Sequence, residues 1–356
     1  IVMEEKKDTL GMLDLVIRPG FCVKENQIIK VNQAAESLFI TPGTDVRPLL
    51  LTGSEEYAAF TGGGLYLTLN LSSHSCGASV TRVDDIDVFL LEQESDNGEL
   101  RSMALAAREL REPLTNVMIT ADSLFPLCAA ESSPRTAEQV ARLNRGLFQI
   151  LRIIGNMSDA ERCAAVSHQE TVDIPALFAE FFEKAETLVS HTGITLTYEG
   201  PDQPIYGLAD REQLERAVLN ILSNAIKFTP KGGTVTAKLT RSGRMLRLSV
   251  TDSGSGIAQS VRSSVFSRYL RQPALEDSRY GIGLGMVLIR TAAAHHGGAV
   301  LIDQPEGVGT RITMTMSIRQ SKQATLRSNV LRVDYAGEQD HGLIELSECL
   351  PTELYE

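Results

Sequence analysis

The stretch Asn220 to Thr229 reads NILSNAIKFT, and the interpretation of the whole chain depends on it. On a helix, Asn220, Asn224 and Lys227 fall at positions i, i+4 and i+7, so two amides and an ammonium group share one stripe. Asparagine carbonyl oxygens are hard ligands that suit Mg²⁺, and a lysine adds positive charge for phosphates. The stretch therefore predicts either a helix that binds a metal and phosphates or a surface helix with a solvated polar face.

Two glycine-rich segments follow this stretch. Asp252 to Gly256 ends a strand-like run, and Gly281 to Gly285 opens an apolar helix. Glycines let backbone N–H groups approach phosphates, a helix N-terminus favours anions, and a carboxylate at a strand end can accept a hydrogen bond from the exocyclic amine of adenine. The residues that we expect to contact a nucleotide here are Asp252, Gly254, Gly256, Gly281, Gly283, Leu284 and Gly285.

The order of these segments resembles the N, G1 and G2 boxes of the histidine-kinase ATP-binding domain, which belongs to the GHKL ATPase superfamily. Phe266 to Arg271 resembles the intervening F box, and Gly307 to Thr310 resembles the last glycine turn. The resemblance covers Thr171 to Ile318, within a predicted domain of residues 169–318. It implies a GHKL-type α/β sandwich, with a helix layer on a mixed sheet.

The same resemblance implies ATP and Mg²⁺ as cofactors. ATP would be contacted by Asn220, Asn224, Lys227 and Thr310, and the metal by Asn224 and Asn220. Superfamily members that hydrolyse ATP carry a glutamate at the position of Asn220, so the resemblance implies phosphoryl transfer rather than hydrolysis. The Arg-rich stretch Tyr269 to Tyr280 is expected to form a mobile lid.

The pattern of apolar residues predicts a helical domain over residues 94–168. Apolar residues alternate spacings of three and four from Leu100 to Leu124 and again from Val140 to Met157. The stretch Pro126 to Pro134 predicts a hairpin loop, which makes the two helices antiparallel. Because they carry more apolar surface than one hairpin can cover, we expect a homodimer with a four-helix bundle. A monomeric bundle or an inert coiled-coil spacer fits the same periodicity.

The first of these helices contains Arg108-Glu109-Leu110-Arg111-Glu112-Pro113-Leu114. This stretch resembles the H box of histidine kinases, His-Glu-Leu-Arg-x-Pro-Leu, except that Arg108 stands in the place of the phosphoacceptor histidine. Phosphoryl transfer to histidine needs a neutral ring nitrogen, whereas a guanidinium stays protonated because its pKa is above about 12. By resemblance, Glu109 is the acid that orients the imidazole, so the substitution puts autophosphorylation in doubt.

Residues 1–93 alternate short β-like runs with polar turns. The segment Val31 to Glu36, which follows a pair of predicted strands and begins a short helix at Asn32, resembles part of a PAS sensor domain. The resemblance implies an α/β sensor, but the sequence names no ligand or signal for it. The expected strands are Phe21 to Lys24, Gln27 to Val31, Leu65 to Leu71, Ala78 to Val83 and Asp87 to Leu91.

Composition limits the class of protein. The 356 residues are 43% hydrophobic, enough for globular cores in two or three domains, which makes the chain an α+β multidomain protein. A formal net charge of -11 argues against nucleic acid as a partner. Five widely spaced cysteines predict reduced thiols, and no apolar run predicts a membrane span, so we expect a cytoplasmic location. A start without Met leaves open that upstream residues are missing.

Residues 319–356 lie beyond the resemblance and receive no functional interpretation. Leu331 to Tyr335 and Gly342 to Leu346 predict two short strands. Three functional hypotheses follow for the chain. The first is a histidine-kinase-like signalling protein that binds Mg·ATP, dimerises, has lost its phosphoacceptor and acts on a response regulator or a partner kinase. The second is an active sensor kinase with an unrecognised acceptor, and the third is an ATP-independent scaffold.

Overall fold

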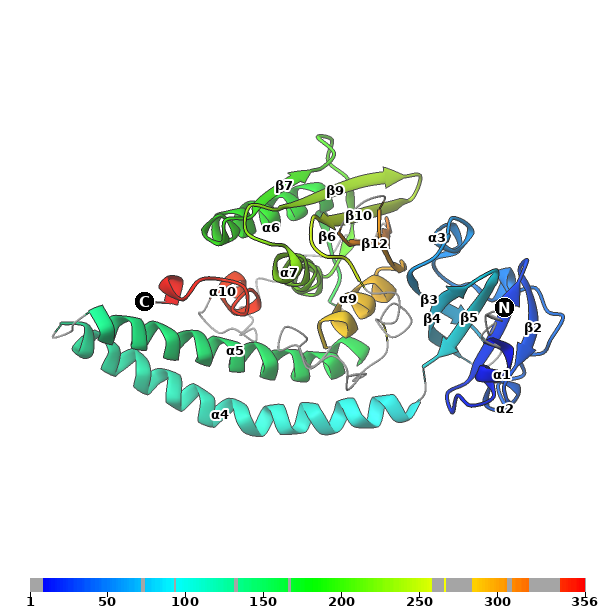
Figure 1. The fold of residues 1–356 in the computed structure, drawn as a ribbon, viewed down its shortest axis with the longest axis horizontal. Helices are drawn as coiled ribbons and strands as arrows, with labels where there is room; N and C mark the ends of the chain where they lie inside the picture. The colour runs from blue at the N-terminus through cyan, green and yellow to red at the C-terminus, as the bar shows by residue number, and fades with distance from the viewer. Residues whose placement is uncertain are drawn as a thin grey trace, which may run out of the picture.

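The computed structural model describes residues 9–71, 74–92, 94–130, 134–165, 168–257, 266, 284–305, 309–319 and 340–355. Three parts follow one another along the chain (Figure 1): an N-terminal sheet, two long helices, and a second α/β region that lies against them. None of the helices in these ranges is both long and apolar enough to cross a membrane.

The N-terminal region, residues 9–92, is an antiparallel sheet in the order β2-β1-β5-β4-β3 with short helices packed on it. Asn32 is buried and caps α2, because its Oδ1 accepts from Ala35 N while its Nδ2 donates to Val16 O and Arg18 O. Its elements are α1 (Thr9–Leu13), β1 (Gly20–Lys24), β2 (Gln27–Val31), α2 (Gln33–Glu36), η1 (Arg47–Leu49), α3 (Ser54–Ala58), β3 (Gly64–Asn70), β4 (Ser75–Val83) and β5 (Ile86–Leu91). All five predicted strands and the helix after Asn32 are present.

The two long helices are α4 (Glu94–Ala130) and α5 (Pro134–Ala165), which pack against each other as a hairpin. The prediction of a loop from Pro126 onward is wrong, since α4 continues through Ala130. Pro126, like Pro113, removes one backbone hydrogen bond of α4, but the helix persists past both.

The second α/β region combines a mixed sheet with the helices α6, α7 and α9 in the part of it that the structure describes. The helices α7 and α9 lie between this sheet and α5 (Figure 1). The sheet runs β11-β12-β10-β9-β7, antiparallel except for the parallel pair β7 and β9, while β6 and β8 pair separately. The elements are β6 (Glu170–Asp173), α6 (Ile174–Val189), η2 (Ser190–Thr192), β7 (Thr195–Glu199), β8 (Tyr206–Ala209), α7 (Arg211–Phe228), β9 (Thr234–Ser242), β10 (Met245–Asp252), α9 (Leu284–His295), β11 (Val300–Asp303) and β12 (Arg311–Ser317).

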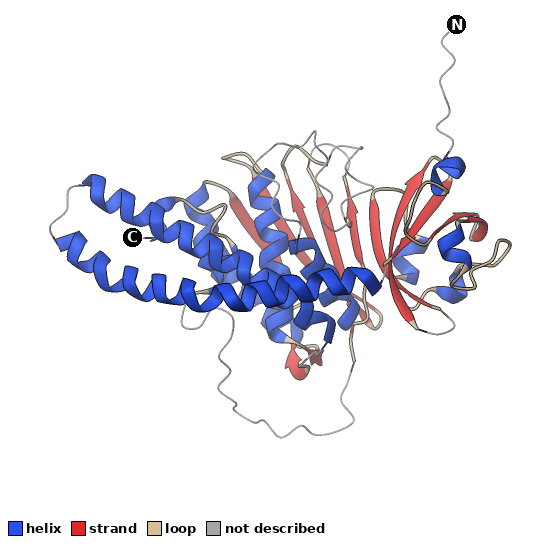
Figure 2. Cartoon of the chain, turned by 90° about the horizontal axis from the view of Figure 1, so that it is seen from below, coloured by secondary structure: helices blue, strands red, loops and turns tan. Residues whose placement is uncertain are grey.

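The two sheets are joined edge to edge. Strand β3 pairs with β11 through Tyr66 with Val300, Leu65 with Leu301 and Gly64 with Ile302, which produces one ten-stranded sheet. Figure 2 shows the strands of the two regions side by side behind the hairpin. Gly63 makes the approach possible, because it has a φ of 94° and a Cβ there would overlap the Ile302 carbonyl oxygen.

The C-terminal segment, residues 340–355, packs between α5 and α7. It contains α10 (His341–Glu345) and η3 (Thr352–Tyr355), so the predicted strand over Gly342 to Leu346 is wrong. Asp340 favours the helix because its Oδ1 accepts from Leu343 N at 3.0 Å. The other predicted strand, Leu331 to Tyr335, lies outside the described residues.

Candidate functional site

Helix α7 is anchored at its first turn. Asp210 caps it, since Asp210 Oδ1 accepts from Gln213 N at 3.2 Å and Oδ2 accepts from His168 N at 2.7 Å. The backbone N–H of Asp210 donates to His296 Nε2 at 3.0 Å, and burial lowers the pKa of His296, which keeps this ring nitrogen available as an acceptor. Helix α7 therefore holds a fixed position relative to α9.

The polar stripe predicted on α7 is present, and its members differ in exposure. Asn220 is buried, and its Nδ2 donates to Arg216 O at 2.9 Å and to Glu345 Oε2 at 3.2 Å. Its Oδ1 is buried without a hydrogen bond within the described part of the chain. Asn224 is half-buried, with Nδ2 3.9 Å from Met286 Sδ. Two amides in different surroundings thus share one stripe.

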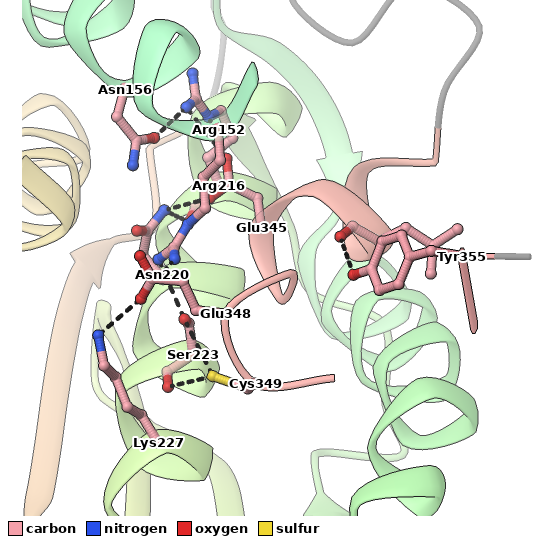
Figure 3. Close-up of polar contacts among 11 residues, drawn as sticks. Arg152, Asn156, Arg216, Asn220, Ser223, Lys227, Glu345, Glu348, Cys349 and Tyr355 are labelled. Carbon is pink, nitrogen blue, oxygen red and sulfur yellow. Dashed lines mark hydrogen bonds and ion pairs between the residues drawn. The ribbon is translucent and has the colours of Figure 1, made fainter. Parts of the chain in front are cut away.

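Lys227 ends the stripe, and it is paired. Its Nζ lies 2.7 Å from Glu348 Oε2 of the C-terminal segment (Figure 3). The ammonium group that the sequence assigns to phosphates is therefore neutralised by a carboxylate of this chain.

Asp252 lies at the end of β10 and is held by backbone N–H groups. Its Oδ1 accepts from Gly254 N at 2.8 Å and from Thr310 N at 3.2 Å. Burial raises the pKa of Asp252, and these two hydrogen bonds oppose the shift. The glycines around it leave no room for side chains, because a Cβ at Gly254 would overlap Phe228 O and one at Gly309 would overlap Asp252 O. The result is a carboxylate in a narrow backbone cradle.

The start of α9 borders the stripe of α7. A Cβ at Gly285 would lie 2.7 Å from Asn220 Oδ1, so the close approach of the two helices requires glycine there. Leu284 is buried together with Val287 against Met103 and Met157 of the hairpin. Gly281 and Gly283 lie outside the described residues, as does the predicted lid.

The F box and the last glycine turn are described only in part. Phe266 of the F box is buried, and its carbonyl oxygen accepts from Arg290 Nη1 at 2.9 Å. Gly307 of the last glycine turn lies outside the described residues. Gly256, at the end of the segment that begins with Asp252, has a φ of 74°, which favours glycine.

These residues fit a Mg²⁺-bound adenine nucleotide. The fit rests on the glycine cradle, the buried carboxylate at a strand end, and the unsatisfied Oδ1 of Asn220. Of the two candidate metal ligands, Asn224 is the more accessible, whereas Asn220 Oδ1 is enclosed by Gly285. Amide oxygens are hard donors suited to Mg²⁺ when phosphates complete the shell.

Arg108 and Glu109 lie apart from this cluster. Both side chains are exposed on α4, and within the described residues no hydrogen bond or ion pair joins them to the stripe of α7 or to Asp252.

Sequence reasoning missed four charged residues beside the stripe, namely Arg152, Arg216, Glu345 and Glu348. Arg216 had a local signal, since it lies one turn before Asn220 on the same side of α7. Glu345 had none, because it meets Asn220 across 125 residues of sequence.

Comparisons with known proteins find relatives by sequence and by fold. Residues 209–320 match the family described as histidine kinase-, DNA gyrase B-, and HSP90-like ATPase. An uncharacterised sensor-like histidine kinase of Rhizobium meliloti is 28% identical over 276 residues, 73% of this chain and 52% of that protein. The adaptive-response sensory kinase SasA of Crocosphaera subtropica is 26% identical over 246 residues, 65% of this chain and 64% of that protein. This chain therefore spans less than two thirds of the length of these two relatives.

Among solved structures, full-length ShkA in complex with AMPPNP has a TM-score of 0.51 with this chain. The two are 24% identical, over 62% of this chain and 46% of that one. This likeness concerns the fold.

Proposed function

We propose that this chain, a member of the sensor histidine kinase family of two-component systems, binds Mg·ATP and dimerises but lacks its own phosphoacceptor. The observation that carries the proposal is Arg108, which replaces histidine in a stretch that otherwise matches, while Asn224, Lys227 and Asp252 keep the residue types of an ATP site. A guanidinium has no lone pair to offer a phosphoryl group at neutral pH.

Nucleotide binding rests on residues of two elements. Asp252 would read the adenine amine through its oxygens at the end of β10, and Asn224 would hold the metal from α7. Lys227 would meet the phosphates once its bond to Glu348 is released. Bound Mg·ATP supplies the phosphoryl group that a kinase of this family transfers. The protein would position that group for transfer.

Dimerisation is supported by apolar side chains that the hairpin leaves exposed. Leu110 and Val117 of α4 are each 50% exposed, and Leu143 and Ile150 of α5 are also exposed, although all four belong to the predicted heptad stripes. Leu114, by contrast, is buried within the hairpin. A second hairpin would cover the exposed set and produce a four-helix bundle.

The dimer proposal has a direct test in light scattering. Leu110→Glu combined with Val117→Glu should produce monomers, because two charges would be buried in the bundle. The matched control is Asn116→Glu, an exposed position of the same helix that leaves the stripe intact. Persistent dimers of the double variant would place the interface elsewhere.

The N-terminal region is proposed to be a PAS-like sensor. Its antiparallel sheet and the capped helix after Asn32 support this assignment, which names no ligand. We further propose a cytoplasmic location, a response regulator or a partner kinase as the protein on which the chain acts, and domain limits at residues 93, 168 and 318. Cys22, Cys76 and Cys349 form no disulfide among the described residues, which fits a reducing compartment.

The central experiment is incubation with γ-labelled ATP and Mg²⁺. The wild-type chain should bind ATP and remain unlabelled. Arg108→His should acquire label that is stable in base and lost in acid, because Glu109 already stands beside the restored imidazole. A separate histidine-containing helical domain, added to the wild-type chain, would reveal transfer to a partner.

Other outcomes favour the two alternatives. Acid-labile label on the wild-type protein would make it an active kinase with an unrecognised acceptor. No saturable ATP binding would make it a scaffold. If Arg108→His binds ATP but stays unlabelled, the helix and the ATP site do not dock productively, since about 1 Å of misplacement can cost on the order of a hundredfold in rate.

A further inference from the structure

The C-terminal segment inserts two glutamates into the candidate nucleotide site. Glu345 is fully buried between two arginines, with Oε1 3.1 Å from Arg216 Nη2 on α7 and Oε2 3.4 Å from Arg152 Nε on α5. The same Oε2 accepts from Asn220 Nδ2 at 3.2 Å. Figure 3 shows these side chains converging from α5, α7 and the C-terminal segment. One carboxylate thus pairs with two buried cations and binds a predicted nucleotide residue.

Glu348 makes a second contact of the same kind. Its Oε2 lies 2.7 Å from Lys227 Nζ and 3.1 Å from Arg152 Nη1. Burial would raise the pKa of Glu348, but Arg152 and Lys227 outweigh burial and hold it below its usual range. Glu348 therefore stays ionised and keeps Lys227 occupied.

The segment is held mainly through its backbone on α5. Arg145 donates through Nε to Ser347 O at 2.9 Å and through Nη2 to Glu348 O at 3.0 Å. At its end, Tyr355 packs edge-on against Phe148 with ring centroids 5.2 Å apart. Arg145 and Phe148 thus hold the segment through contacts separate from those of the Glu345 and Glu348 carboxylates, so Arg145 can be altered without touching a predicted nucleotide residue.

We propose that residues 340–355 are an intramolecular ligand of the nucleotide site, in which Glu345 and Glu348 hold the cations and the amide that the phosphates of Mg·ATP would engage. The proposal rests on the proposed function, because it needs the stripe of α7 to be a phosphate site. Carboxylate and phosphate oxygens are both anionic acceptors for ammonium and guanidinium groups, so the segment and the nucleotide compete. The ion pairs of Glu345 and Glu348 with Arg152 also link the hairpin to the proposed ATP site, because Arg152 belongs to α5.

Competition between the segment and ATP can be measured as a change in the affinity for ATP. When only the fraction of molecules with a released segment can bind, the apparent dissociation constant for ATP rises in inverse proportion to that fraction. Variants that loosen the segment without changing the site should therefore bind Mg·ATP more tightly than the wild type. A purely structural role of the segment predicts unchanged or weaker binding.

Calorimetry of the full chain with Mg·ATP provides the test. Glu348→Gln removes the charge that holds Lys227 and Arg152, and we expect about tenfold tighter binding. Arg145→Ala removes the hydrogen bonds of Arg145 to the segment and no contact of the Glu348 carboxylate, and we expect about threefold tighter binding. The matched control is Arg142→Ala, one turn earlier on α5, whose partner Glu138 is on the same helix. Its affinity should equal that of the wild type.

A second measurement uses the wild-type chain and so does not depend on a variant that folds. Amides of the segment, such as Leu346 N and Leu350 N, are protected by hydrogen bonds to Gly342 O and Leu346 O. Saturating Mg·ATP should accelerate their hydrogen exchange severalfold, since the nucleotide displaces the segment. Unchanged or slower exchange, with ATP bound, overturns the proposal.

The outcomes separate this inference from the proposed function. Equal ATP affinity of wild type, Glu348→Gln and Arg145→Ala overturns the inference and leaves ATP binding intact. Absence of ATP binding in all folded variants overturns both. Tighter binding in the two loosened variants, together with faster exchange in the wild type, supports the segment as a competing ligand.

Discussion

The two ends of the candidate site are built in different ways. The Asp252 end is made from backbone N–H groups of residues close to β10 and β12, with glycines that leave no space for side chains. The α7 end is made from charged side chains of α5, α7 and the C-terminal segment, three elements far apart in sequence. The first end is fixed by the local backbone, whereas the second depends on ion pairs between side chains of distant elements.

The largest expected effect comes from the Asp252 end. Asp252→Asn keeps the shape but removes the charge that accepts from adenine, and ATP binding should weaken by about 30- to 100-fold. Preference for ATP over GTP should disappear as well, because guanine lacks the amine at that position. Calorimetry with both nucleotides measures this. Ser255→Ala, an exposed position of the same turn, should bind like the wild type. If Asp252→Asn keeps its ATP preference, Asp252 does not contact adenine.

A substitution in the glycine cradle around Asp252 should have the second largest effect on ATP binding. Gly309→Ala places a Cβ against Asp252 O at a φ of 112°, so the turn must shift, and ATP binding should weaken by about tenfold. Gly243→Ala is the control, since Gly243 also has a positive φ but has no neighbour in contact with a Cβ. Thermal melting should show that both variants fold. Equal ATP affinity for the two variants would mean that the cradle is not part of the site.

The α7 end should show a smaller and conditional effect. Asn224→Ala should weaken ATP binding by about fivefold with Mg²⁺ present and leave it unchanged in EDTA, because the lost amide oxygen acts only through the metal. Titrations with and without Mg²⁺ distinguish the two cases. An equal loss in EDTA would assign Asn224 to the nucleotide rather than to the ion.

A still smaller effect is expected from mild acid, which should change ATP affinity through the Asp252 end and not through the α7 end. The pKa of Asp252 is raised by burial, so lowering the pH protonates it sooner than an ordinary aspartate and removes an acceptor for adenine. The pKa of Glu348 is lowered, so its pairs with Lys227 and Arg152 survive at the same pH. Between pH 7 and 5 we expect the affinity for ATP to fall about threefold more in the wild type than in Asp252→Asn. The variant is the control, because protonation of the nucleotide itself affects both proteins equally. Parallel pH profiles would contradict the assignment.

The Asp252 end was predictable because its signals are local. The carboxylate, the turn glycines and the strand before them occur within a few residues, and backbone geometry requires glycine at Gly254 and Gly309. The stripe of Asn220, Asn224 and Lys227 was predictable for the same reason, since helical periodicity alone places the three on one side.

The contact between the C-terminal segment and the stripe of α7 was not predictable from the sequence. The apolar residues around Ile344 favoured a strand, and only the side chain of Asp340 and the packing against α5 and α7 make the segment helical. The partners of Glu345 lie on two helices more than a hundred residues away. Residue types indicate that a buried glutamate needs cations, but they do not indicate which ones.

The joint between β3 and β11 restricts how the N-terminal region can move relative to the second α/β region. Free swivelling about this joint would break the backbone ladder that pairs Tyr66 with Val300 and Gly64 with Ile302. A slip of the ladder that keeps buried side chains on the buried face must advance by two residues, about 7 Å. Any change of register at this joint would therefore come in steps of two residues, and such a step would also break the ion pair between Arg290 of α9 and Glu92 beside this edge.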